Sequence, residues 1–113
     1  MSENLKSRTK EFSLSIINLV EKMNYSITNK VIANQLLRSA TSVGANYRAA
    51  TRARSDREFI AKLRIVLEEA DETCFWLEII ESKKWMDVKN ELKEANELTA
   101  IFVTSIKKMN NKL

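Results

Sequence analysis

Four acidic side chains within one predicted helix are the residues of this chain with the clearest capacity for chemistry. They are Glu68, Glu69, Asp71 and Glu72, and converging carboxylates are the usual ligands of hard cations such as Ca²⁺. At about 100° per residue, however, these positions spread around a helix and do not converge on one point. The sequence also lacks histidine, which removes the commonest general base and the commonest neutral metal ligand. The acids are therefore typical of a solvated or protein-binding face.

Hydroxyl and thiol groups make no stronger case for catalysis. Ser39, Thr41 and Ser42 would each need an activating base to act as nucleophiles. Cys74 is the only cysteine, and its predicted place on a buried stripe is typical of a small core residue. The single glycine also excludes a glycine-rich phosphate loop. We therefore expect a non-enzymatic protein that uses no cofactor and no metal.

Length and composition indicate one small helical domain. The chain has 113 residues, of which 44% are hydrophobic and 30% charged, with one glycine and no proline. This is the balance of a soluble all-α protein, and the length suits a single domain over residues 1–113. No segment approaches the roughly 18 apolar residues of a membrane span, and the first residues lack the apolar run of a signal peptide. We expect a cytoplasmic protein without a membrane partner.

Hydrophobic spacing predicts four amphipathic helices. The first should cover about residues 5–23, with Ser13 facing water, and the third residues 56–83. Thr28 and Asp87 are the predicted caps of the second and fourth helices, and Ser55 should cap the third. The second helix also carries small residues on one flank, where backbones can approach closely: Ala33, Ala40 and Gly44. Four apolar stripes with short connections predict an antiparallel up-down-up-down four-helix bundle.

The charges are segregated along the chain. Residues 29–67 contain eight Lys or Arg against two Asp or Glu, whereas residues 68–81 contain six acids and no base. On the second helix, four basic residues fall within an arc of about 80° opposite the apolar stripe. They are Lys30, Arg38, Arg48 and Arg52, here called the basic ridge. Besides a merely solvated face, the ridge fits two roles: a strip that binds phosphates, or a docking face for acidic residues.

The outer face of the third helix combines apolar and acidic side chains. Ile65, Phe75, Trp76 and Ile79 share an arc with Glu68 and Glu72; these six residues are here called the outer patch. A monomeric bundle would leave this surface exposed unless Trp76 folded onto its own subunit, and exposed apolar surface of this kind usually marks a protein interface. We expect self-association of the outer patch with a basic face, a heterologous contact of the type that closes into rings.

Several runs of residues resemble a known family over nearly the whole chain. The most specific is residues 42–46, Ser-Val-Gly-Ala-Asn, followed by Arg-Ala-Arg-Ser at 52–55 and Glu-Phe-Ile-Ala-Lys-Leu at 58–63. In order and spacing they closely resemble the four-helix-bundle proteins encoded by intervening sequences of bacterial 23S rRNA genes. The resemblance implies an up-down bundle that assembles as a homopentamer. It also implies kinship with the small basic accessory protein of diversity-generating retroelements, which binds a reverse transcriptase.

We therefore predict a self-assembling, non-enzymatic bundle whose first candidate partner is RNA, or DNA. The basic ridge would contact phosphates without reading bases, because no aromatic platform accompanies it on that face. The alternative is a protein-binding adaptor whose basic surface meets an acidic partner, for example one that docks a reverse transcriptase.

Overall fold

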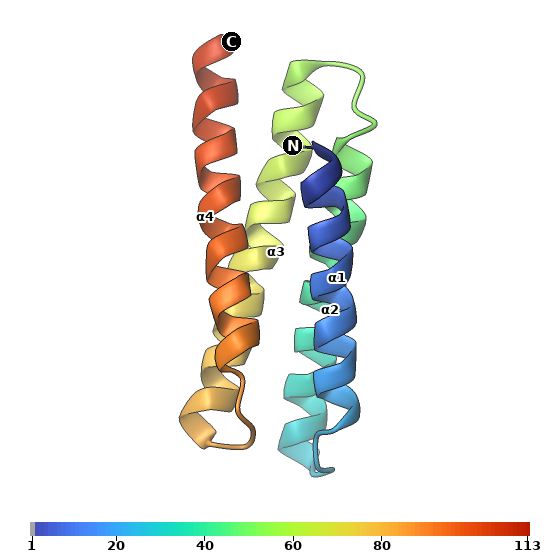
Figure 1. Ribbon diagram of the computed structural model, residues 1–113, viewed down its shortest axis with the longest axis vertical. Helices are drawn as coiled ribbons and strands as arrows, with labels where there is room; N and C mark the ends of the chain where they lie inside the picture. The colour runs from blue at the N-terminus through green and yellow to red at the C-terminus, as the bar shows by residue number, and fades with distance from the viewer. Residues whose placement is uncertain (1) are drawn as a thin grey trace.

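The computed structural model describes the backbone of residues 2–113 and the side chains from residue 4 onward. It contains four α-helices: α1 (Ser2–Glu21), α2 (Ile27–Ala50), α3 (Asp56–Lys83) and α4 (Lys89–Lys112). Successive helices run in opposite directions (Figure 1). Together they form a rod with extents of 47 × 21 × 21 Å. The predicted antiparallel four-helix bundle is confirmed.

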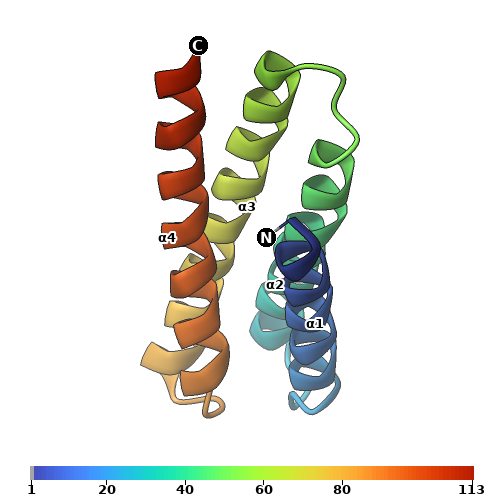
Figure 2. The same cartoon turned by 45° about the horizontal axis from the view of Figure 1, so that its top comes forward.

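The core consists of one apolar stripe from each helix. Figure 2 shows α1 beside α2 on one side of the rod and α3 beside α4 on the other. The largest fully buried side chains include Ile16, Leu36, Val43, Leu63, Leu77, Leu98 and Phe102. Cys74 is also buried, as its place on the predicted stripe requires. On α3 the stripe is rotated slightly from the prediction, because Ile60 is buried and Phe59 only half-buried.

The third helix begins as predicted, and its capping explains why. The backbone N–H of Glu58 donates to Ser55 Oγ at 3.1 Å, which satisfies one of the free donors at the helix start. Among the hydrogen bonds of the described residues, this is the only half of the reciprocal capping box that is present. At the other end Lys84 adopts a left-handed conformation with φ 58° and terminates the helix.

The predicted caps of α2 and α4 are each displaced by one or two residues. The residue that caps α2 is Ser26, whose Oγ accepts from the Asn29 N–H at 3.0 Å, so Thr28 lies inside the helix. The N-cap position of α4 is occupied by Val88. Asp87 lies one residue earlier, yet its carboxylate still accepts from the Lys89 N–H at 3.1 Å.

The close approach of α1 and α2 depends on Gly44. A Cβ at this position would lie 3.2 Å from Ser13 Oγ and 3.3 Å from the Thr9 carbonyl oxygen. The pattern of the first helix alone predicted that Ser13 faces water, but this prediction is wrong. Ser13 lies at the contact with α2, and its hydroxyl donates to the Thr9 carbonyl at 3.1 Å. The flank of small residues on α2 therefore permits tight backbone packing, as predicted.

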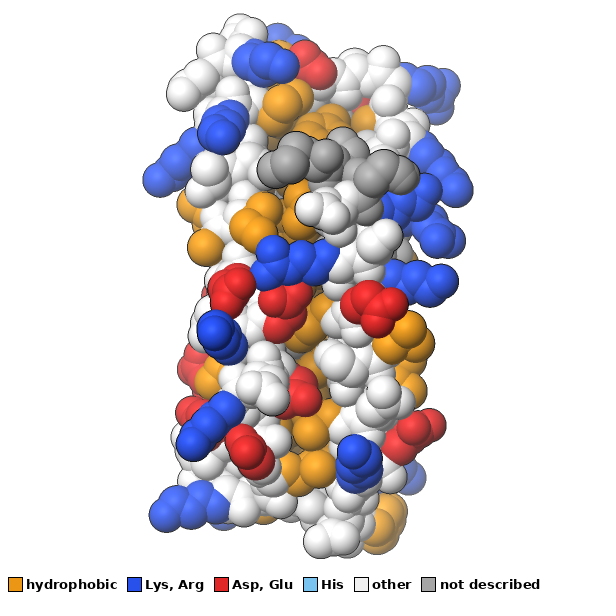
Figure 3. Space-filling model, in the orientation of Figure 1, with side chains coloured by type: hydrophobic (Ala, Val, Ile, Leu, Met, Phe, Trp, Pro, Cys, Tyr) orange, Lys and Arg blue, Asp and Glu red, His pale blue; other side chains and the backbone are white. Residues whose placement is uncertain are grey.

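The contact between α1 and α4 is the sparsest of the four contacts between neighbouring helices. Figure 3 shows hydrophobic side chains along this seam, crossed near its middle by acidic and basic groups. Arg8 forms a two-pronged pair with Glu94, with Nε to Oε2 and Nη2 to Oε1 both 2.7 Å, and a further contact with Glu97 at 3.0 Å. These bonds raise the pKa of Arg8. The ion pair thus joins the two helices where apolar packing is thin.

Candidate nucleic-acid interface

The four residues of the basic ridge are all exposed, but only Lys30, Arg38 and Arg48 lie on α2, whereas Arg52 lies in the turn just after the helix ends at Ala50. Their neighbours nevertheless differ, because Arg38 and Arg48 lie at opposite edges of the arc. Arg38 is next to α3, and Arg48 is next to α1. Lys30 and Arg52 lie near the two ends of α2. The ridge is therefore not one uniform surface.

Arg38 is engaged by two acids of its own subunit. Its Nη1 lies 3.1 Å from Glu69 Oε1, and its Nη2 pairs with the Glu72 carboxylate. The bond to Glu72, followed by the bond to Glu69, raises the pKa of Arg38. The charge of one of the four ridge residues is thus already offset within the bundle. Of the four ridge residues, Arg38 has the weakest case as a phosphate ligand.

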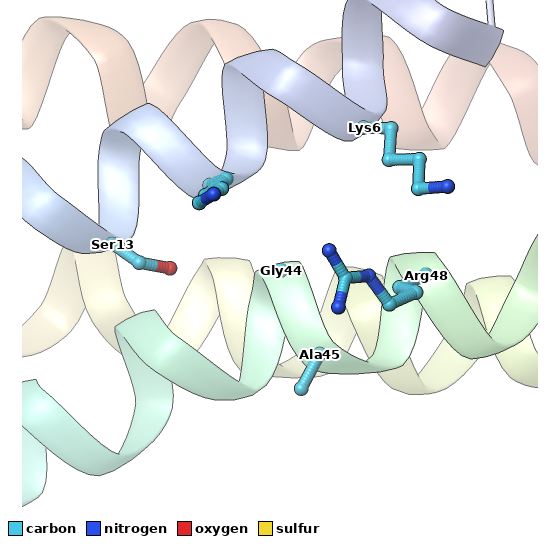
Figure 4. Close-up of a pocket in the computed structure, with 6 residues that line it drawn as sticks. Lys6, Ser13, Gly44, Ala45 and Arg48 are labelled. Atoms are coloured by element: carbon cyan, nitrogen blue, oxygen red, sulfur yellow. The ribbon is translucent and has the colours of Figure 1, made fainter.

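Arg48 belongs to a cleft between α1 and α2, which we call the α1–α2 cleft. Its volume is about 300 Å³, and its lining residues are Lys6, Lys10, Ser13, Gly44, Ala45 and Arg48. Figure 4 shows Lys6 reaching from α1 and Arg48 from α2 into the space between the helices, with Ser13 at one end. Among the described residues, the lining of the cleft contains three cationic side chains and no acidic one.

Among the described side chains, no acidic group pairs with the cations of the α1–α2 cleft. The ion pairs found among residues 4–113 involve Arg8 and Arg38, and none includes Lys6, Lys10 or Arg48. Figure 3 shows Lys and Arg side chains gathered along the side of the molecule formed by α1 and α2. Three cations that line one concave site are suited to binding an anion.

Lys6 and Lys10 were not among the residues predicted from the sequence for this surface. A signal was present, because the two lysines are four positions apart and so share one face of a helix. The prediction considered the charges of the second helix alone. Only the packing of α1 beside Gly44 shows that this lysine face lies across from Arg48.

The outer patch on α3 divides into exposed and half-buried residues. Ile65 and Phe75 are 43% and 53% exposed. Glu68 is exposed as well, whereas Ile79 is half-buried and borders a surface hollow of about 370 Å³ together with Phe75. The exposed part of the patch keeps the apolar character that the sequence predicted.

Trp76 and Glu72 are largely occupied within the subunit. Trp76 packs partly against the core, meets Phe75 edge-on at 4.9 Å between ring centroids, and donates from Nε1 to Glu72 at 2.9 Å. This hydrogen bond is the main cause that lowers the pKa of Glu72, and the Arg38 bond adds to it. The patch that remains free for a partner is therefore smaller than the one predicted.

The four acids on α3 are not arranged as a metal site. No three acidic or cysteine side chains in the described part of the chain are grouped to hold a metal ion. Glu69 and Glu72 instead face Arg38, while Glu68 and Asp71 are exposed. No helix among the described residues is long and apolar enough to cross a membrane.

Comparisons with known proteins agree with the fold and with the family resemblance. A protein of unknown function from the S23 ribosomal protein family of Bacteroides thetaiotaomicron has a similar crystal structure, with a TM-score of 0.83 and 34% sequence identity. The alignment covers 95% of this chain and 99% of that one. None of the curated proteins matches the sequence. The family described as 23S rRNA-intervening sequence protein matches residues 4–111. With nearly the full length matched, the chain belongs to the 23S rRNA-intervening sequence protein family.

Proposed function

We propose that this protein is a non-enzymatic, self-assembling bundle that binds the phosphate backbone of nucleic acid, RNA in the first place. The observation that carries the proposal is the α1–α2 cleft, which Lys6, Lys10 and Arg48 line with no acidic side chain among the other described lining residues. Lys30 and Arg52 extend the positive surface along α2. Lys and Arg that neutralise phosphates release counterions from the nucleic acid, which is the main source of sequence-independent affinity.

The same surface favours contacts with backbone over contacts with bases. No aromatic side chain lines the α1–α2 cleft, so the site lacks the stacking platform that single-strand binding proteins use. Arginine and lysine on a helical surface hold phosphates without distinguishing the attached bases. Little sequence preference is therefore expected. The family name supports RNA as the first ligand to test.

Salt dependence of RNA binding tests this proposal. The affinity of the assembled protein for RNA should fall steeply with salt, and the variant Arg48→Ala/Arg52→Ala should flatten the log-log slope by roughly 1.4 to 1.8, since each phosphate contact contributes about 0.7 to 0.9. A matched control is Lys93→Ala/Lys107→Ala, which removes the same charge from exposed positions on α4. An equal change in both variants would indicate an effect of net charge alone. The absence of binding at low salt would contradict the proposal.

We further propose that the subunits associate through the exposed part of the outer patch. Ile65 and Phe75 leave apolar surface in water beside the hollow next to Ile79, and burial of such surface drives association. A pentameric ring is the assembly that the family resemblance implies. A ring would repeat the α1–α2 cleft around one axis, which would raise the avidity for a long polyanion.

A protein-binding adaptor is the second candidate function. It is favoured by the same exposed Phe75 and Ile65, which suit a partner protein as well as another copy of the chain. In that case the basic surface would meet an acidic partner, such as an acidic face of a reverse transcriptase. A folded, assembled sample that fails to bind RNA at low salt would favour this function.

A further inference from the structure

The α1–α2 cleft differs from the rest of the basic surface in its shape. Lys30 on α2 and Arg52 in the turn after it are exposed outside the cleft, whereas Lys6, Lys10 and Arg48 line one concavity of about 300 Å³. A concavity of this size is at the lower limit for small-molecule sites. It suits one phosphate group with its attached sugar, and is far too small for a segment of duplex.

Small residues of α2 form part of the cleft wall and leave space between the helices. Gly44 and Ala45 contribute little or no side chain, and Ser13 closes one end. The Ser13 hydroxyl already donates to the Thr9 carbonyl at 3.1 Å. Recognition of a ligand in the cleft therefore depends on the three cations that surround it, rather than on a network of neutral hydrogen bonds.

The three cations of the α1–α2 cleft carry more positive charge than one internal phosphate of a strand can neutralise. A phosphodiester carries a single negative charge, whereas a phosphate monoester carries about −1.5 to −2 at neutral pH and three strong acceptor oxygens. The guanidinium of Arg48 can hold two of these oxygens at once, and each lysine can hold one as a point charge. The charge and the number of donors both match a monoester better than a diester.

We propose that the α1–α2 cleft binds a terminal phosphate monoester of a nucleic-acid strand in preference to an internal phosphodiester. This inference rests on the proposed function, since the exposed ridge residues would hold the adjoining backbone while the cleft receives the end. The site accordingly has two parts. Lys6, Lys10 and Arg48 select the terminal group, and Arg52 and Lys30 add affinity that is independent of it.

The test compares one RNA oligonucleotide in three forms: with a 5′-phosphate, with a 3′-phosphate and with hydroxyl groups at both ends. At moderate salt and pH 7.5, at least one phosphorylated form should bind roughly tenfold more tightly than the form without phosphate, the effect of one additional charge-assisted hydrogen bond. Inorganic phosphate should compete away this preference before it abolishes binding. Equal affinity for all three forms would overturn the terminal-phosphate inference and leave backbone binding intact. Failure of every form to bind at low salt would overturn both proposals.

The pH dependence provides an independent readout. The second pKa of a phosphate monoester is about 6, and the protein contains no histidine that would change its own charge in this range. The preference for the phosphorylated form should therefore shrink between pH 7.5 and pH 5.5. A preference that stays constant over this range would contradict recognition of the dianion.

Two single variants separate the cleft from the surrounding ridge. Lys10→Ala should remove most of the preference for the phosphorylated strand, because Lys10 lines the cleft. Arg52→Ala, which removes the same charge outside the cleft, should weaken binding of all three oligonucleotides and leave their ratio unchanged. Both positions are exposed, so folding of each variant can be verified by circular dichroism. If Lys10→Ala and Arg52→Ala reduced the preference for the phosphorylated oligonucleotide equally, the preference would come from overall charge. This result would overturn the proposed site.

Discussion

The indole Nε1 of Trp76 donates a 2.9 Å hydrogen bond to the carboxylate of Glu72, one turn earlier on α3. Arg38 of α2 pairs with the same carboxylate and also reaches Glu69. Arg38 was predicted as part of the basic ridge, and Glu72 and Trp76 as part of the outer patch. In the structure these residues form one contact between neighbouring helices of one subunit. This contact ties the orientation of Trp76 to the packing of α2 on α3.

Acid should weaken the contact around Glu72. Its pKa is lowered in the folded protein, so the carboxylate contributes stability above the ordinary glutamate pKa of about 4.3, and this stability is lost as pH falls through the lower folded value. Because the Glu72 side chain is 35% exposed, the contribution at pH 7 should be below about 1 kcal/mol. Thermal melts should therefore show Glu72→Gln slightly less stable than the parent at pH 7 and equal to it near pH 2. Glu68→Gln, a change at an exposed acid, is the control. If the difference in stability between the parent and Glu72→Gln were as large near pH 2 as at pH 7, the effect could not be due to the charge of Glu72.

The third helix shows how far local signals determine an element. Its observed bounds are the predicted ones, because Ser55 has the capping-box spacing to Glu58 and its side-chain oxygen accepts from the Glu58 N–H. The start of α2 was predicted wrongly, since Ser26 and Thr28 are both good caps two residues apart. The residue that caps the helix is Ser26, and Ile27 after it is 79% exposed.

The candidate site was harder to predict because it depends on which helices become neighbours. A helical wheel places Arg38 and Arg48 on one arc, but only the packed bundle shows that one faces the acids of α3 and the other the lysines of α1. The close approach of α1 to α2 requires the small residue at Gly44. The face of a residue on its helix follows from local sequence, whereas its partners follow from tertiary packing.

Gly44 should tolerate no large side chain. A Cβ would already lie 3.3 Å from the Thr9 carbonyl oxygen, and this oxygen belongs to the backbone of α1 and cannot rotate away. Gly44→Leu should therefore destabilise the bundle by about 1–3 kcal/mol through overpacking, even though leucine gains up to about 1 kcal/mol in helix propensity. Ala45→Leu at the adjacent exposed position should change stability by less than about 0.5 kcal/mol. Urea melts of the two variants measure the difference. Equal stability would show that α1 moves freely relative to α2.

Cys74 should be unreactive in the folded protein. Its side chain is 5% exposed, its Sγ lies 3.4 Å from Asn96 Oδ1, and burial raises the pKa of the thiol. Since the thiolate is the reactive form and must also be reached by the reagent, native protein at pH 8 should react with a disulfide reagent at least about 100-fold more slowly than protein unfolded in urea. The Cys74→Ala variant provides the blank. Rates within a few-fold of each other would place this part of α3 in a frequently open state.

The exposed part of the outer patch should control assembly more than the half-buried part. Phe75 is 53% exposed in the isolated subunit, so Phe75→Glu should cost the fold little, whereas a charge in an apolar interface should weaken association by about 2 kcal/mol or more. Trp76→Glu is a poorer test, because it also removes a hydrogen bond to Glu72 and packing against the core. Light scattering should find a large species for the parent and smaller ones for Phe75→Glu, with unchanged helix content by circular dichroism. Glu68→Gln should leave the molar mass nearly unaltered, because an exposed charge at a rim is worth well under about 1 kcal/mol. A parent chain that is monomeric at micromolar concentration would leave the apolar surface of Phe75 and Ile65 without a partner copy, and would favour a different protein as its ligand.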